Sequence, residues 1–133
     1  LMCVKEIVET QKAPAAIGPN SQAVVHNGLM FISGQLPINP ITGEISTGIE
    51  VQTRQVLENL KGLLEDSGSS MERVLKTTIY ITNLDNFEKI NSIYSKYFIE
   101  RCPARACVEV SRLPKNVEIE IEAVAVIFRR CLG

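Results

Sequence analysis

Two side chains that could bind or transform a small acid lie in a β-rich segment, residues 104–110. Arg105 and Cys107 are two positions apart, so in a strand they share one face. The following β-rich segment carries Glu120 and Glu122. If the two segments form a hairpin, Cys107 lies opposite Glu120 and Arg105 lies opposite Glu122. This register predicts a guanidinium, a thiol and at least one carboxylate on one face.

These groups suit hydrolysis next to a carboxylate. A guanidinium matches a carboxylate in two parallel hydrogen bonds, and Arg105 could hold a small acid in this way. A nearby glutamate could order or deprotonate a water molecule. Backbone N–H groups near Cys107 could hold an oxygen or nitrogen on which charge develops.

Plainer interpretations of the same residues stay open. One arginine and several glutamates on one face are also typical of a solvated ion-pair surface. Cys107 in a strand is usually a small buried hydrophobe, and as a nucleophile it would need a base, whereas the single His26 falls in a predicted turn. The spacing of Glu120 and Glu122 resembles that of an inverting glycosidase, but the chain has no Trp to stack on a sugar.

Length and composition limit the classes of protein. The chain has 133 residues, which predicts a single domain over residues 1–133. With 45% hydrophobic residues, 14 basic against 15 acidic residues and a net charge of −1, it resembles an ordinary globular protein. The chain lacks the excess of basic residues that would favour a nucleic-acid partner. The longest apolar run has six residues, over 123–128, so we expect no membrane partner. No leader peptide is evident, and we expect a cytoplasmic protein.

The four cysteines, Cys3, Cys102, Cys107 and Cys131, are expected to stay reduced. Their spacing offers no typical zinc site, and no glycine-rich phosphate loop follows a predicted strand. We therefore expect neither a metal nor a cofactor.

Hydrophobic periodicity predicts two helices among six strands. A capping box at Thr47–Glu50 opens a helix of about 18–20 residues that stops at Gly68. A second capping box, Asp85–Glu88, opens a helix that ends before Pro103. The sequence Asn27-Gly28 predicts a tight hairpin. The expected strands cover residues 5–10, 22–26, 29–35, 74–81, 104–110 and 117–128.

This order predicts an α+β sandwich with both helices on one face of a mostly antiparallel sheet. The last strand places Val117, Ile119, Ile121, Ala123, Ala125 and Ile127 on the side that faces the helices. Its other side carries glutamates and then Val124, Val126 and Phe128. A single chain would leave that apolar end in water, so we expect it to pack on another subunit.

Several motifs together resemble the Rid family, the YjgF-type reactive-intermediate deaminases, over about residues 7–127. The resemblance implies a chorismate-mutase-like fold and a homotrimer with ligand sites in the clefts between subunits. The motifs are AAIGP at 15–19, SGQ at 33–35, NP and TG within 39–43, PARACVEV at 103–110, RLPK at 112–115 and IEIEA at 119–123.

The resemblance also implies an activity without a cofactor. Rid proteins hydrolyse short-lived 2-imino and enamine acids, such as 2-aminoacrylate and 2-iminopropionate, to a 2-keto acid and ammonia. Carried onto this chain, Arg105 would hold the substrate carboxylate and Glu120 would hold or activate water. Backbone groups at Gly34 and Cys107 would contact the substrate. Ser33 and Asn20 complete the implied substrate-binding set.

Two positions depart from the family pattern. Asn20 stands where the family has a tyrosine that closes over the ligand, and Cys102 stands before Pro103 where an aromatic residue and a longer loop are frequent. Asn20 keeps open a second interpretation, a regulatory module that binds a 2-keto acid without turnover. RNA binding or cleavage, ascribed to some relatives, is disfavoured by the net charge of −1.

Overall fold

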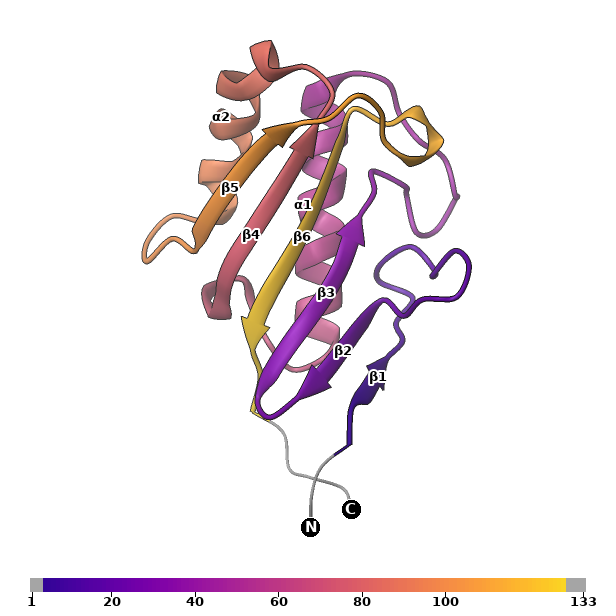
Figure 1. The fold of residues 1–133 in the computed structure, drawn as a ribbon, viewed down its shortest axis with the longest axis vertical. Helices are drawn as coiled ribbons and strands as arrows, with labels where there is room; N and C mark the ends of the chain where they lie inside the picture. The colour runs from indigo at the N-terminus through magenta and orange to yellow at the C-terminus, as the bar shows by residue number, and fades with distance from the viewer. Residues whose placement is uncertain (1–3, 129–133) are drawn as a thin grey trace.

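Six strands form one sheet with the spatial order β1-β2-β3-β6-β4-β5 (Figure 1). The computed structural model describes residues 4–128, and Cys3 and Cys131 lie outside the described residues. Neighbouring strands are antiparallel except β4 and β5, which are parallel. The predicted α+β class is confirmed. The strands are β1 (Glu6–Val8), β2 (Ala23–His26), β3 (Leu29–Gln35), β4 (Val74–Ile81), β5 (Ala104–Glu109) and β6 (Ile119–Val126).

The predicted hairpin between β2 and β3 is confirmed. His26 pairs with Leu29, and the two residues between them, Asn27 and Gly28, have φ values of 51° and 77°. Positive φ at both central positions is the geometry of a type I′ turn, which asparagine and glycine tolerate. The turn chemistry therefore fixes the register of this part of the sheet.

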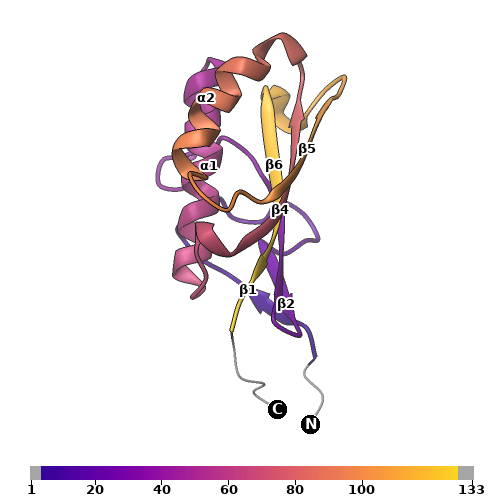
Figure 2. The ribbon, with the colours of Figure 1, turned by 90° about the vertical axis from the view of Figure 1, so that its left-hand side faces the viewer.

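Both helices, α1 (Ile49–Asp66) and α2 (Phe87–Tyr97), cover the same face of the sheet (Figure 2). Gly68, with φ of 93°, follows α1 as predicted. Neither predicted capping box forms. The N-cap of α1 is Gly48, one residue after Thr47, and it makes no side-chain cap bond. A short 3-10 turn over Leu84–Asn86 delays the start of α2 to Phe87.

The core lies between the sheet and the helices. The alternation predicted for the last strand is confirmed, because Ile119, Ile121 and Ala125 are completely buried. Burying such side chains supplies the main driving force for this arrangement, about 25 cal/mol per Å² of apolar surface. The same core includes Met30, Ile32, Ile79 and Ile81 from the sheet, Val56, Leu57, Leu60, Leu63 and Leu64 from α1, and Ile90 and Ile93 from α2.

The predicted hairpin between β5 and β6 is wrong. β5 pairs in parallel with β4, and β6 pairs with β3 and β4 instead. The reason is α2, which connects β4 to β5 as a crossover, and a crossover through a helix returns the chain parallel to the strand it left. β5 is consequently an edge strand, separated from β6 by β4.

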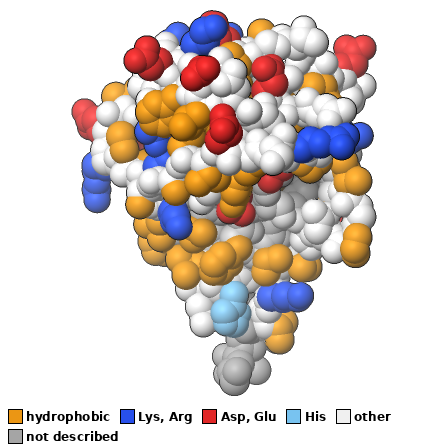
Figure 3. All heavy atoms as spheres, turned by 45° about the horizontal axis from the view of Figure 1, so that its top comes forward, with side chains coloured by type: hydrophobic (Ala, Val, Ile, Leu, Met, Phe, Trp, Pro, Cys, Tyr) orange, Lys and Arg blue, Asp and Glu red, His pale blue; other side chains and the backbone are white. Residues whose placement is uncertain are grey.

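The other face of the sheet is not covered by the helices. Hydrophobic side chains gather on it among scattered charges (Figure 3). Phe31 is 48% exposed there and pairs across the strands with Val24 and Val124. We call Val24, Phe31, Val124 and Val126 the open-face patch.

Within residues 4–128, no helix has the length and apolar character needed to cross a bilayer.

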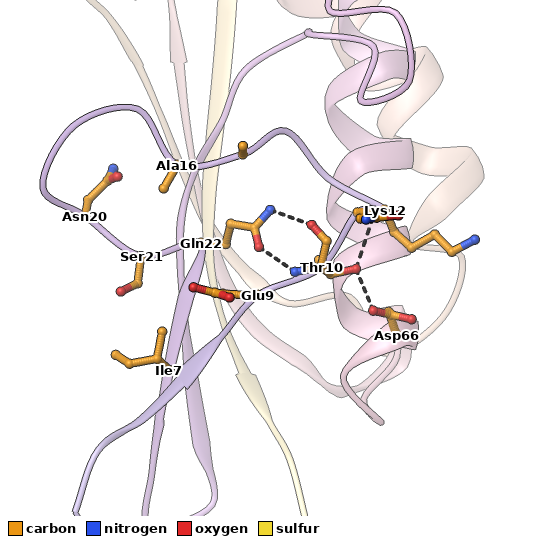
Figure 4. A pocket seen from close by; sticks show the side chains of 11 residues that line it. Ile7, Glu9, Thr10, Lys12, Ala16, Asn20, Ser21, Gln22 and Asp66 are labelled. Carbon is orange, nitrogen blue, oxygen red and sulfur yellow. Dashed lines mark hydrogen bonds between the residues drawn. The ribbon is translucent and has the colours of Figure 1, made fainter.

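The loop between β1 and β2 is held by one buried amide, that of Gln22 (Figure 4). Its Oε1 accepts a hydrogen bond from the backbone N–H of Thr10 at 2.7 Å. Its Nε2 donates to the carbonyl oxygens of Thr10 at 2.9 Å, Pro14 at 2.9 Å and Ala13 at 3.2 Å. The Thr10 hydroxyl donates in turn to Asp66 at 2.5 Å, which ties the loop to the end of α1.

We expect Gln22→Met to destabilise the fold by about 2–4 kcal/mol, because it leaves several backbone polar groups near the core without partners. Urea unfolding monitored by circular dichroism measures this change. Gln11→Met is the matched control, because Gln11 is exposed and should change the free energy of unfolding by less than about 0.5 kcal/mol. Equal effects of the two substitutions would contradict the role given to the Gln22 amide.

Candidate active site

A cleft of about 560 Å³ lies at the end of β3 nearest the start of β6. We call it the Glu120 cleft. It brings together four residues of the predicted site: Asn20, Ser33, Gly34 and Glu120. Its full lining is Pro14, Ala15, Ala16, Ile17, Asn20, Ser21, Gln22, Ser33, Gly34, Gln35, Leu36, Ile38, Pro114, Lys115 and Glu120.

Glu120 lies directly over the backbone of Gly34. The ladder between β3 and β6 shifts register between Ile32 and Gln35, so Ser33 and Gly34 form an irregularity in β3 at this point. A Cβ atom at Gly34 would collide with the carboxylate and the side-chain carbons of Glu120. The missing side chain of Gly34 is therefore what allows Glu120 to fold down onto the strand.

Ser33 links the strand to the loop that forms the opposite wall. Its hydroxyl donates to the carbonyl oxygen of Ser21 at 2.6 Å, and its backbone N–H donates to the carbonyl oxygen of Gln22 at 3.0 Å. The loop that carries Asn20 is thus fastened to β3 beside Gly34. Ser33 shapes the cleft, and its hydroxyl proton is engaged within the wall.

The carboxyl group of Glu120 has a pKa above its ordinary value. Burial is the larger cause, because it disfavours the charged form, and the negative charge of Glu122 adds to it. Glu122 accepts a hydrogen bond from the Tyr80 hydroxyl at 2.5 Å, and this bond is the main reason that the pKa of Tyr80 is also raised. A carboxylate with a raised pKa is a better proton acceptor for a water molecule.

Arg105 does not share a face with Glu120, and the predicted register is wrong here. Arg105 pairs with Thr77, which is completely buried on the helix side of the sheet. Its guanidinium donates to Oδ1 of Asn91 in α2 at 2.7 Å. The same guanidinium lies over the rings of Tyr94 and Phe87, at 5.0 Å and 5.4 Å from their centroids.

Cys107 lies on the same side as Arg105, because its cross-strand partner Ile79 is buried under the helices. Burial raises the pKa of the Cys107 thiol, and the positive charge of Arg105 offsets part of that effect. The protonated thiol is thereby favoured, and a thiolate nucleophile is not. Cys102 and Cys107 form no disulfide within the described residues. His26 lies beside the β2–β3 turn and does not line the Glu120 cleft.

Three residues that contribute to these surroundings were not predicted. Asn91 could have been found from its spacing, because Phe87, Asn91 and Tyr94 fall on one helix face at i, i+4 and i+7. Lys115 lines the Glu120 cleft from the 3-10 turn Pro114–Asn116, and no periodicity indicates this. Gln35 carries a buried Oε1 that has no hydrogen-bond partner within the described chain.

The predicted site residues of one chain thus lie in two separate places. The Glu120 cleft supplies a carboxylate of raised pKa on one side of the sheet, and Arg105 supplies an oriented guanidinium on the exposed edge strand at the other side. Among residues 4–128, no three His, Cys, Asp or Glu side chains converge as metal ligands.

Comparison with known proteins identifies relatives over nearly the whole chain. The family model described as Endoribonuclease L-PSP matches residues 10–127. A RutC family protein of Pyrococcus horikoshii is 54% identical over 123 residues, which cover 92% of this chain and 98% of the relative. TdcF of Escherichia coli, which is named as a reactive intermediate deaminase, is 46% identical over 126 residues, covering 92% and 98%.

Solved structures agree with these matches. A Rid family protein of Yersinia pestis, YyfA, has a TM-score of 0.91 and 48% identity, covering 93% of this chain and 100% of that one. Escherichia coli TdcF with bound serine has a TM-score of 0.89 and 45% identity, covering 92% and 99%. These matches extend over Arg105 and over the Glu120 cleft, and the chain belongs to the Rid family, the YjgF-type proteins.

Proposed function

We propose that this protein hydrolyses reactive 2-imino and enamine acids, such as 2-iminopropionate and 2-aminoacrylate, to 2-keto acids and ammonia. Each active site would form between two subunits, where Arg105 of one subunit faces the Glu120 cleft of its neighbour. The observation that carries the proposal is the location of Arg105 and Glu120 on opposite faces of the sheet. A small ligand can contact both groups only if two chains contribute.

Two features of the surface support assembly. β5 is an edge strand, and Arg105 on it is exposed. The open-face patch leaves Phe31 half exposed, and apolar surface of this kind is stabilised by a partner. The resemblance to the Rid family implies a homotrimer, in which three such contacts close a ring.

Arg105 and Glu120 have complementary tasks in the proposed reaction. The guanidinium of Arg105 binds the substrate carboxylate through two hydrogen bonds, and Asn91 and the two aromatic rings fix its orientation. Glu120 orients a water molecule toward C2 of the imine and takes its proton. The C–O bond forms while the electrons of the C=N bond move to nitrogen.

Glu120 then returns this proton to nitrogen, which completes a carbinolamine. Glu120 next takes the hydroxyl proton of the carbinolamine and passes it to the amino group, so the C=O bond forms as the C–N bond breaks, and the keto acid and ammonia leave. The raised pKa of Glu120 suits both directions of this transfer, because a carboxyl group that ionises nearer neutrality both accepts and donates a proton readily. An enamine substrate first takes a proton at C3 and loses one from nitrogen to become the imine. No cofactor takes part in any of these steps.

The names of relatives support this class of reaction. TdcF carries the name reactive intermediate deaminase, and its solved structure holds serine, an amino acid with a free carboxylate. A Lactococcus lactis relative, AldR, is named as a regulator instead. Asn20 favours keeping that alternative, a module that binds a 2-keto acid without turnover, because an amide cannot close the cleft as an aromatic ring does.

We expect the wild-type protein to remove imines faster than buffer does. An amino-acid oxidase generates the imine in place, and semicarbazide traps what survives. Arg105→Ala should abolish the acceleration, since the carboxylate anchor is lost, whereas Arg54→Ala on the exposed side of α1 should keep it. If the wild-type rate equals that of buffer while the protein binds the product keto acid, the regulatory alternative replaces the proposal.

Mixing two inactive variants tests where the site lies. Arg105→Ala and Glu120→Gln should each be inactive, yet subunits exchanged by refolding an equal mixture should regain about a quarter of the wild-type sites. Those sites combine an intact Glu120 from one variant with an intact Arg105 from the other. A mixture that stays inactive although mixed assemblies have formed would place both residues in one subunit's site and contradict the model.

Gly34→Ala should reduce kcat/KM by about ten- to a hundredfold, because the new methyl group displaces the Glu120 carboxylate. The fold should be retained, since φ at Gly34 is accessible to alanine. The decisive control is the double variant. In a Glu120→Ala background, Gly34→Ala should leave the affinity for the product keto acid unchanged, because no carboxylate is left to displace, and weaker binding would show that Gly34 acts by another route.

We expect kcat/KM to fall as the pH is lowered, because protonation of Glu120 removes the base. The fall should begin at a pH above the ordinary titration range of a glutamate, because the pKa of Glu120 is raised. Glu122→Gln removes one of the two causes of the raised pKa, so the acid limb of the kcat/KM profile should move to lower pH. Glu118→Gln is the control, because Glu118 does not contribute to the pKa of Glu120. A limb that moves equally in both variants, or in neither, contradicts the assignment of Glu120 as the base.

A further inference from the structure

We propose that the Glu120 cleft prefers 2-imino acids whose side chain ends in a second carboxylate, and that the ammonium group of Lys115 binds this carboxylate. This inference rests on the proposed deaminase function and concerns the class of substrate at the same site. It starts from a mismatch between the size of the cleft and the size of the smallest substrate.

The cleft has a volume of about 560 Å³. Clefts of roughly 300–1,000 Å³ hold ligands much larger than a three-carbon imino acid. Asn20, whose side chain is short, lines this cleft. Within a single chain, the cleft therefore has room beside Glu120 for a side chain of several atoms.

Charge in the cleft lining is confined to two groups, Lys115 and Glu120. Glu120 is occupied with the water molecule in the proposed reaction. The Lys115 side chain is exposed, and within the described chain its ammonium group has no hydrogen bond or ion pair. A free cation on the wall of a substrate cleft selects for an anionic group on the ligand.

The backbone holds Lys115 at this wall. Lys115 and Asn116 both adopt left-handed conformations, with φ of 58° and 55°. Such conformations are unfavourable for residues other than glycine and persist where the surroundings impose them. Here the Nε of Arg112 donates to Oδ1 of Asn116 at 3.0 Å, and the N–H of Asn116 donates to the carbonyl oxygen of Leu113 at 3.1 Å.

The braced turn continues directly into β6. Lys115 and Glu120 are therefore five residues apart on one continuous segment, and both border the same cleft. A dicarboxylic imine would place one carboxylate on Arg105 of the neighbouring subunit, its reacting carbon at Glu120 and its second carboxylate toward Lys115. The Lys115 charge would then offset the repulsion that Glu120 and Glu122 exert on this second carboxylate.

Two substrates of equal chain length test the proposal. 2-Iminoglutarate ends in a carboxylate and 2-iminopentanoate ends in a methyl group. We expect wild type to have the higher kcat/KM for 2-iminoglutarate. Lys115→Asn removes the charge and tolerates the left-handed conformation. It should lower kcat/KM for 2-iminoglutarate by about two- to fivefold at low salt and leave that for 2-iminopentanoate unchanged.

Lys115→Arg should restore most of the preference, because it keeps the charge. Lys61→Gln, on the exposed surface of α1, removes the same charge away from the cleft and should change neither substrate. The inference is overturned if Lys115→Asn lowers kcat/KM equally for both substrates, or if the wild type shows no preference for 2-iminoglutarate. Turnover of 2-iminopentanoate would still support the deaminase function in either case.

Binding of the product acids decides the inference even if neither imine is turned over. Titration calorimetry compares 2-oxoglutarate with 2-oxopentanoate on the same variants. Tighter binding of 2-oxoglutarate to wild type that is lost in Lys115→Asn and regained in Lys115→Arg supports the role of Lys115. Equal binding of the two acids to wild type refutes it.

Discussion

The arrangement of the site depends on the strict alternation of side chains along β6. One side of this strand is buried under both helices, and Ile119, Ile121 and Ala125 are completely buried there. Glu120 is therefore directed to the other side, where it meets the irregularity of β3 at Gly34. A shift of one residue would bury the carboxylate in the core and expose the isoleucines. The core thus enforces the position of the candidate base.

The crossover through α2 imposes the second constraint. Because it returns the chain parallel to β4, β5 becomes an edge strand with Arg105 on the helix side of the sheet. α2 then supplies Asn91 and the two aromatic rings that orient the guanidinium. The same topology that orients Arg105 also separates it from Glu120, and this separation makes assembly part of the proposed chemistry.

Local signals in the sequence predicted local structure well. The Asn27-Gly28 turn, the bounds of β4 and the stop at Gly68 depend on neighbouring residues, and the structure confirms them. The alternating pattern of β6 also identified its buried face. The pairing of β5 with β6 failed because alternation shows which residues of a strand share a face but not which strand lies beside it. Of the site, Asn20, Ser33, Gly34 and Glu120 come together in one cleft, whereas Lys115 depends on a turn that no periodicity reveals.

Arg105 also bears on the aggregation of a single chain, because it lies on a free strand edge. A free strand edge offers its backbone to any other extended chain, and proteins commonly discourage such contacts with a charged side chain at that position. β5 carries Arg105 and Glu109 on an edge that is otherwise small or apolar, with Ala104, Ala106 and Val108 exposed. The residue that would hold the substrate in the proposed assembly can therefore also protect a single chain against aggregation.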